Sequence, residues 1–142
     1  MTIAAILAGK GNDVVGLDPD LTLLAAATLL ADRRIGAAPV IEGGRVIGIF
    51  SERDVIHAVK THGTAALDTI VRTAMTAPAI SVTPADSVLG ALSLMTRRRI
   101  RHLPVCEGEA LVGFVSIGDL VKYRIDRIEA DAAAMRDYIQ GV

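Results

Sequence analysis

The sequence has few aromatic residues and little net charge. Aromatic residues make up 3% of its 142 residues, and tryptophan is absent. The core must therefore be built from alanine, valine, isoleucine and leucine, and the chain is long enough for one compact domain. The formal net charge of −1 attracts neither nucleic acid nor an anionic membrane. The few aromatic side chains also provide no stacking surface for single-stranded nucleic acid.

Cysteine is nearly absent, and no long apolar run occurs. Cys106 is the single cysteine, so an internal disulfide and a cysteine-based zinc site are excluded, and we interpret it as a small apolar residue. The N-terminus has no basic signal-peptide region, which predicts a cytoplasmic location. Residues 21–31, the most apolar segment, are about half as long as a membrane span. His57 and His62 show no metal-ligand spacing, so we expect no metal site.

Catalytic motifs are also missing. No nucleophile and base, and no carboxylate pair, stand in a recognisable arrangement. Gly43-Gly44 is interpreted as a hairpin turn, because no Gly-Lys-Ser/Thr follows it as in a phosphate-binding loop. We therefore expect no catalytic residues and a protein that is not an enzyme.

The sequence does contain an internal repeat. Residues 80–124 align with residues 15–59 at a constant offset of 65, without a gap, and fourteen of the 45 positions are identical. Each copy ends in a similar stretch, GIFSERDV in the first and GFVSIGDL in the second. Two copies in register indicate a tandem pair rather than a solenoid.

The same local signals occur in both copies and predict a β-α-β-β-α unit in each. Asp18-Pro19 and Thr83-Pro84 are expected to start the first helices, with a capping box from Thr83 to Asp86. Gly36 is expected to end the first of these helices, and the second, with Arg101 at that position, to end differently. The predicted strands are 13–17, 38–41, 46–50, 79–82, 103–106 and 111–115, and the predicted helices are 19–34 and 84–99.

These units predict an α/β fold in which the two copies pack sheet to sheet around one shared core. We divide the chain into a first repeat (1–66), a second repeat (67–124) and a helical extension (125–142). Residues 60–79 are expected to include a short helix. The extension continues a helix whose apolar spacing predicts packing on the domain or on a second chain. That apolar stripe consists of Leu120, Val121, Ile125, Ile128, Ala132, Met135 and Ile139.

The Ser-x-x-Asp pattern of each copy allows two compatible interpretations. Ser51 with Asp54, and Ser116 with Asp119, can cap the helix that follows. A carboxylate beside a cleft can also accept both hydroxyls of a ribose, while the serine and the first-turn amides meet a phosphate. The spacing alone does not choose between a cap and a ligand site.

The paired motifs resemble the CBS domain family. The matching stretches are IGAAPVIEGGRVIGIFSERDVI and IRHLPVCEGEALVGFVSIGDLV, and the resemblance covers residues 1–124. It implies a disc-like homodimer with adenine nucleotides bound in clefts between the repeats. The usual ligands are AMP, ADP and ATP, with S-adenosylmethionine or NAD derivatives in some members. Many members sense energy or metabolite levels.

The resemblance also implies roles for particular residues. Asp54 and Asp119 would bind ribose, with Ser51 and Ser116 near the phosphate. Arg101, within a basic run that includes Arg99 and His102, would bind phosphate, or these cations would only offset a helix dipole. Gly36 replaces Arg101 in the first copy, so the clefts should be unequal, and which aspartate lies near Arg101 is left open. Adenine would contact Val82, Thr83, Leu103 and Pro104, or Leu17, Ala38 and Pro39, and Lys10 would reach a phosphate or remain a solvated loop residue.

We therefore expect a non-catalytic sensor that binds an adenine nucleotide without a further cofactor, and whose homodimer rearranges with ligand. One alternative is a ligand-free dimerisation or scaffold module that binds another protein through its C-terminal helix. The other is an enzyme, for example a weak nucleotide hydrolase. Neither nucleic acid nor a membrane is an expected partner.

Overall fold

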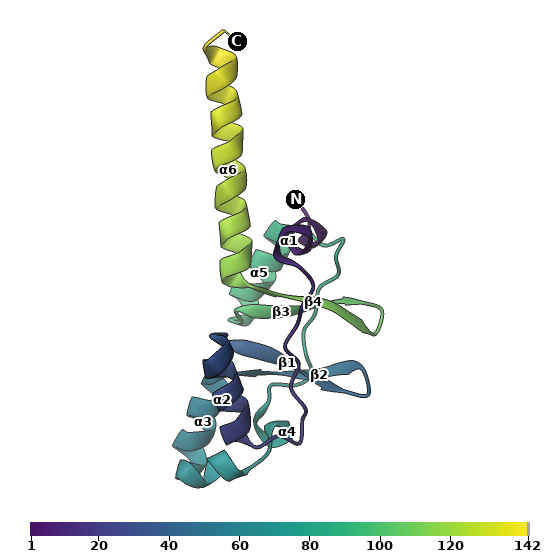
Figure 1. Ribbon diagram of the computed structural model, residues 1–142, viewed down its shortest axis with the longest axis vertical. Coiled ribbons are helices and arrows are strands. Elements are labelled where there is room, and N and C mark those ends of the chain that lie inside the picture. The colour runs from purple at the N-terminus through teal and green to yellow at the C-terminus, as the bar shows by residue number, and fades with distance from the viewer. Residues whose placement is uncertain (142) are drawn as a thin grey trace.

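The computed structural model describes residues 1–141, which form two stacked β-hairpins with helices beside them (Figure 1). Each hairpin is a two-stranded antiparallel sheet, β1-β2 in the first repeat and β3-β4 in the second. The elements are α1 (Ile3–Lys10), α2 (Leu23–Arg33), β1 (Ala37–Glu42), β2 (Arg45–Ser51), α3 (Glu52–His62), the 3₁₀ helix η1 (Gly63–Asp68), α4 (Val71–Ala74), α5 (Val88–Arg98), β3 (His102–Glu107), β4 (Ala110–Ser116) and α6 (Ile117–Ile139).

The structure confirms the two predicted hairpins and the short helix α4 of the connection. It also confirms the helix that follows each hairpin, α3 in the first repeat and the long final helix α6 in the second. The predicted strands 13–17 and 79–82 are wrong as strands. Each is reduced to one parallel bridge, Leu17 to Val40 and Val82 to Val105. The Leu17 amide donates to the Pro39 carbonyl, and the Leu17 carbonyl accepts from Ile41. The chain then turns away at Asp18, so no further ladder can form.

The predicted starts of the first helices are also wrong. Helix α2 begins after Thr22 and α5 after Ser87, and each side chain accepts a hydrogen bond from the third helical amide. The two proline-containing segments instead form turns. In the second of them, the Thr83 amide donates to the Asp86 carboxylate at 2.8 Å. Thr83-x-x-Asp86 is therefore a turn that precedes the helix and not a capping box.

The two helices end alike, contrary to the expectation for Gly36 and Arg101. Arg34 and Arg99 occupy the left-handed region, each with φ of 55°, and the residue after each donates back to a carbonyl in the last turn. The local hydrogen bonds outweigh the preference of this conformation for glycine. Gly36 and Arg101 come two residues later, where their carbonyls accept from the first residue of α3 and of α6.

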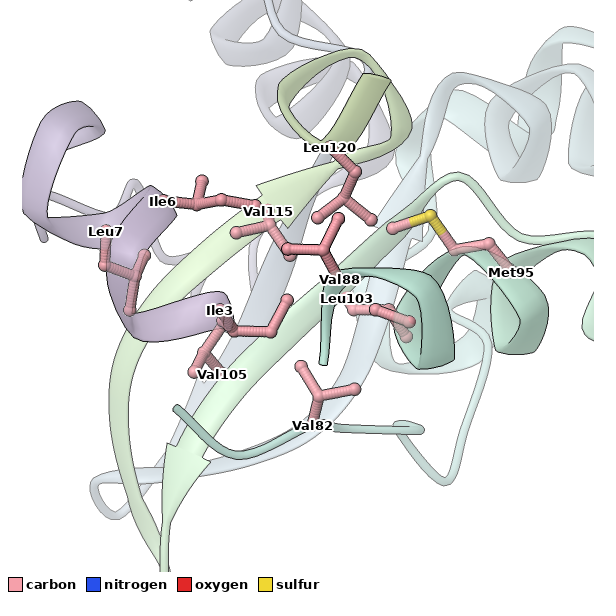
Figure 2. Packing of buried hydrophobic residues seen from close by; sticks show 11 residues of the cluster. Ile3, Ile6, Leu7, Val82, Val88, Met95, Leu103, Val105, Val115 and Leu120 are labelled. Carbon is pink, nitrogen blue, oxygen red and sulfur yellow. The ribbon is translucent and has the colours of Figure 1, made fainter. Parts of the chain in front are cut away.

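Each repeat has its own hydrophobic core, so the expected shared core is wrong. The first centres on Phe50, which is fully buried, and the second on Leu103 and Leu120. Figure 2 shows Ile3, Ile6 and Leu7 of α1 against Val105 and Val115 of the second repeat. The N-terminal helix therefore completes the core of the repeat that comes later in the sequence.

Helix α4 makes the reciprocal contact. It lies at the start of the second repeat (67–124), but Val71 is fully buried in the first core. The Val71 amide donates to the Leu21 carbonyl, and the Ile3 amide donates to the Asp86 carbonyl, which is the equivalent position after the offset of 65. The repeats thus exchange their leading segments. The division of the chain into repeats between residues 66 and 67 stays a prediction.

Two equivalent glycines mark where these exchanged segments approach the hairpins. A methyl group at Gly48 would lie 2.9 Å from the backbone oxygen of Thr76, whereas one at Gly113 would meet only the flexible Leu7 side chain. We expect Gly48→Ala to lower the free energy of unfolding by about 1–3 kcal/mol and Gly113→Ala by about 1 kcal/mol or less. Urea denaturation of both variants measures the difference, and equal losses would contradict the exchange-packing account.

Candidate functional site

A cavity of about 480 Å³ lies between the two repeats. Its volume falls within the range of about 300–1,000 Å³ that is typical of small-molecule sites. The polar part of its wall comes from both repeats: Ser51, Glu52, Arg53 and Asp54 from the first, with Thr76, Arg99, Arg101 and His102 from the linker and the second. The apolar part includes Ile49, Ile56, Pro78, Ala79, Ile80 and Ile100.

Asp54 is fixed at the cavity by the start of α3. The Ser51 side chain accepts from the Asp54 amide, and the Ser51 amide donates to Asp54 Oδ2 at 2.9 Å, which completes a capping box. Oδ1 faces the other way and accepts from the Thr76 hydroxyl at 3.1 Å. The cap therefore orients the carboxylate, and its second oxygen remains at the polar rim of the cavity.

The cations of the cavity come mainly from the left-handed end of α5. Arg99 is the left-handed residue itself, and Arg101 follows just before β3. Arg53 reaches across from α3, and its guanidinium donates to the Arg99 carbonyl at 3.4 Å. Arginine in such a cluster can donate two parallel hydrogen bonds to a phosphate. Asp54 of the first repeat thus shares its cleft with Arg101 of the second.

His102 forms part of the cavity wall on the side of the second repeat. Its ring stacks on Phe114 with 5.8 Å between ring centroids. Partial burial lowers the pKa of His102; Asp119 opposes this effect, whereas Lys10 and Arg101 reinforce it. A neutral imidazole is therefore favoured at neutral pH, and it can donate or accept one hydrogen bond at the wall.

Asp119 has a different environment from its counterpart Asp54. It makes the same capping box with Ser116, but Lys10 Nζ lies 2.6 Å from Asp119 Oδ2 and also donates to the Phe114 carbonyl. Partial burial raises the pKa of Asp119, but the hydrogen bonds from Lys10 and the Ser116 amide outweigh it, so the net shift is downward. This carboxylate is held ionised by a lysine of the same chain.

The different environments of Asp54 and Asp119 follow from the different lengths of α4 and α1. Helix α4 ends at Ala74, whereas α1 continues to Lys10, one turn beyond the equivalent end. That extra turn carries Lys10 to Asp119, whereas the segment after α4 provides Asp54 with a hydrogen bond from the Thr76 hydroxyl. Lys10 is neither a solvated loop residue nor part of the cavity wall.

Five of the residues predicted for ligand contact lie on the cavity wall: Ser51, Asp54, Arg99, Arg101 and His102. The predicted adenine contacts lie elsewhere. Val82, Leu103, Pro104, Leu17, Ala38 and Pro39 are buried in the two repeats, and Thr83 is exposed in its turn. Ser116, Asp119 and Lys10 also lie outside this cavity, and contact of any of these residues with a ligand stays a prediction.

Sequence reasoning missed Arg53, Thr76 and the isoleucines of the wall. Arg53 lies between the serine and the aspartate of the motif, in the first turn of α3, where side chains border the cleft. Its position was therefore a usable signal. The role of Thr76 could not be read in the same way, because it depends on how the linker folds back to pair with Ile49.

Comparison with known proteins identifies the family. The family model for the CBS domain matches residues 11–61 and 71–126, so the chain belongs to the CBS domain family and carries two tandem copies. It is 33% identical to the CBS domain-containing protein CBSX3, mitochondrial, of Arabidopsis thaliana, over 99% of this chain and 72% of the relative. It is 32% identical to the CBS domain-containing protein YhcV of Bacillus subtilis, over 86% of each.

Solved structures show the same fold. A CBS-domain protein from Agrobacterium tumefaciens is 39% identical and superimposes with a TM-score of 0.84, over 87% of this chain and 99% of that one. A CBS domain protein from Pyrobaculum aerophilum, solved in complex with AMP, is 31% identical with a TM-score of 0.74, over 84% and 89%. Among residues 1–141, no helix is suited to cross a bilayer, and no group of three His, Cys, Asp or Glu side chains could hold a metal.

Proposed function

We propose that this protein is a non-catalytic regulatory module that binds an adenine nucleotide, with AMP as the first candidate, in the cleft between its repeats. The observation that carries the proposal is the cavity in which Asp54 of the first repeat meets Arg99 and Arg101 of the second. The AMP complex of the 31% identical Pyrobaculum protein supports the choice of ligand. A cytoplasmic location and a role in energy sensing are part of the same proposal.

The wall of the cavity offers a partner for each part of a nucleotide. Asp54 is an oriented acceptor for ribose hydroxyls, and the arginines are donors for phosphate. Ile49, Ile56 and Ile80 provide apolar surface for a purine. Asp54 already accepts bonds from Ser51 and Thr76, which favours a fixed binding group over a general base. We therefore place the adenine against these isoleucines rather than against the buried residues.

An exposed apolar face supports a homodimer. Leu24, Ile56, Leu89 and Val121 are between 42% and 70% exposed, on α2, α3, α5 and α6. The first and third, and the second and fourth, are equivalent under the repeat offset of 65. A face repeated by internal symmetry suits a two-fold contact between identical chains. The dimer is therefore proposed to form through these four helices.

Ile56 couples the two proposed surfaces. It lines the cavity, and it is 70% exposed on the proposed dimer face. A nucleotide that fixes this wall would favour one arrangement of the two chains over another. Such differential affinity is what lets a ligand shift a conformational equilibrium. The proposed output is a change in the angle between subunits, which a protein partner reads.

The proposal assigns phosphate binding to Arg101 and excludes Lys10 from it. Arg101→Ala is expected to raise the dissociation constant for AMP about ten- to hundredfold, because a charge-assisted contact is lost. Lys10→Met is expected to leave it unchanged within about twofold, because Lys10 is bound to Asp119 outside the cleft. Calorimetry with AMP measures both. Equal weakening in the two variants would contradict this assignment.

A ligand-free scaffold is the second candidate, because the exposed apolar residues of α6 offer a surface for another protein. The two candidates differ in ligand binding. If the purified protein binds none of AMP, ATP, NADH and S-adenosylmethionine below millimolar concentration and remains dimeric, the scaffold function is the better description. Turnover of a bound nucleotide would instead indicate an enzyme.

A further inference from the structure

Helix α6 carries a regular apolar seam along the part that projects beyond the domain (Figure 1). The seam consists of Val121, Ile125, Ile128, Ala132, Met135 and Ile139, which are spaced alternately by four and three residues. This is the heptad spacing of a coiled coil, in which such residues occupy the a and d positions. A helix that packs only on its own domain does not need so strict a period of 3.5 residues.

Within residues 1–141, the large apolar side chains of the seam remain exposed. Ile125 is 48% exposed, Ile128 54% and Ile139 73%. The opposite side of the helix makes the contact with the domain, where Tyr123 packs against the second core. Beyond its first turn, α6 has no buried residue within Ile117–Ile139. The heptad seam therefore faces away from the protein and needs a partner helix to bury it.

The charged residues beside the seam indicate what that partner is. In the heptad register, Arg124 and Asp131 are at g positions, and Glu129 and Arg136 are at e positions. In a parallel in-register pair, each g residue meets the e residue five positions later on the other helix. A second copy of α6 would thus pair Arg124 with Glu129 and Asp131 with Arg136. Both pairs are attractive, and two-fold symmetry makes each of them twice.

An antiparallel pair is disfavoured by the same charges. When two α6 helices run antiparallel with their seams in contact, each e position lies opposite an e position of the other helix, and each g position lies opposite a g position. Lys122 would then face Arg136, Glu129 would face its own copy, and Asp131 would face its own copy. Like charges placed opposite one another are destabilising. The charge pattern therefore favours the parallel orientation of a self-pair.

We propose that α6 binds α6 of a second copy as a parallel, in-register coiled coil over residues 121–139. The inference rests on the proposed homodimer and extends it, because Val121 belongs both to the seam and to the proposed dimer face. The only hydrogen-bond contact found for Arg124 within the described chain is a 4.0 Å approach to the Met1 sulfur, a weak acceptor, so it is available for Glu129 of the second copy. The coiled coil holds the two domains together at one end. Because it is stiff, a change in the angle between the domains would move the far end of the coiled coil.

Disulfide trapping in the full chain tests the orientation. The native thiol is first removed by Cys106→Ala. Ile128→Cys then places a thiol at a d position, where parallel copies bring it against itself, and Ala130→Cys provides a matched control on the outer face. In a glutathione buffer, we expect the Ile128→Cys variant to form covalent dimers about tenfold faster or more than the Ala130→Cys variant, because of the higher effective concentration. Adding Glu129→Arg should slow trapping, and Arg124→Glu with Glu129→Arg should restore it.

Each outcome decides the inference. If sedimentation shows a dimer but the Ile128→Cys variant is trapped no faster than the Ala130→Cys control, the coiled coil is wrong, while the homodimer and the nucleotide site remain. If Ile128→Cys with Ala132→Cys is trapped and neither of the two single variants is, the pair is antiparallel and the inference is overturned. A monomer at all concentrations overturns both the homodimer and the coiled coil. AMP titration of the same sample decides the nucleotide site separately.

Discussion

Asp54→Asn is expected to weaken AMP binding about ten- to hundredfold without unfolding the protein. The carboxylate offers a fixed acceptor at the cleft, and asparagine replaces one of its two oxygens by a donor. Asparagine keeps one oxygen that can accept from the Ser51 amide, so the helix cap is preserved in part. Calorimetry measures the change in affinity, and circular dichroism shows whether α3 and the fold are retained.

Asp119→Asn is the matched control. The two aspartates share the same capping box, but Asp119 is bound by Lys10 and lies outside the cavity. Its replacement is expected to change the dissociation constant for AMP by no more than about twofold. A large loss in Asp119→Asn, with little change in Asp54→Asn, would show that the nucleotide occupies the other cleft.

Phe50→Ala is expected to lower the free energy of unfolding by about 3–5 kcal/mol. Phe50 has no exposed surface and is the largest side chain in the first core. Its removal leaves a cavity in a core that shares no residue with the core of the second repeat. The strand that holds Phe50 ends at Ser51, so nucleotide binding should be lost together with stability. Urea denaturation gives the free energy of unfolding.

Phe114→Ala provides the comparison, since the chain has only two phenylalanines. Phe114 is half-buried and stacks on His102 at the edge of the second repeat. A half-buried ring leaves a smaller cavity, so we expect a loss of about 1–2 kcal/mol. Equal losses for the two variants would show that the cost does not follow the burial of the ring and would contradict the central place of Phe50 in the first core.

The architecture of each repeat could be predicted from the sequence, because its strongest signals are local. Gly43-Gly44 and Gly108 mark the tight hairpin turns, and the apolar runs on either side form the strands. The Ser-x-x-Asp capping boxes are confirmed in both copies. The expectation that Gly36 ends the first helix, and that the second helix ends differently, was wrong, because Arg34 and Arg99 adopt a conformation that local propensity assigns to glycine.

The exchange of α1 and α4 could not be predicted, because it depends on contacts between distant residues. Nothing local in Ile3 or Val71 says which of two similar cores each will enter. The same limit applies to the candidate site. Which aspartate lies near Arg101 is decided by the packing of the repeats, and the engagement of Asp119 depends on one additional turn of α1 that carries Lys10. The prediction of unequal clefts was based on Gly36. The structure adds a second difference, because Asp119 binds Lys10 whereas Asp54 accepts a hydrogen bond from Thr76.

The proposed nucleotide site is tested most directly by titrating the unmodified protein with AMP in a calorimeter. Binding in the cleft beside Asp54 and Arg101, with Asp119 occupied by Lys10, predicts a saturable heat that ends at one nucleotide per chain. Two equivalent nucleotides per chain would contradict the inequality of the clefts. The absence of any saturable heat up to millimolar AMP would contradict AMP binding itself.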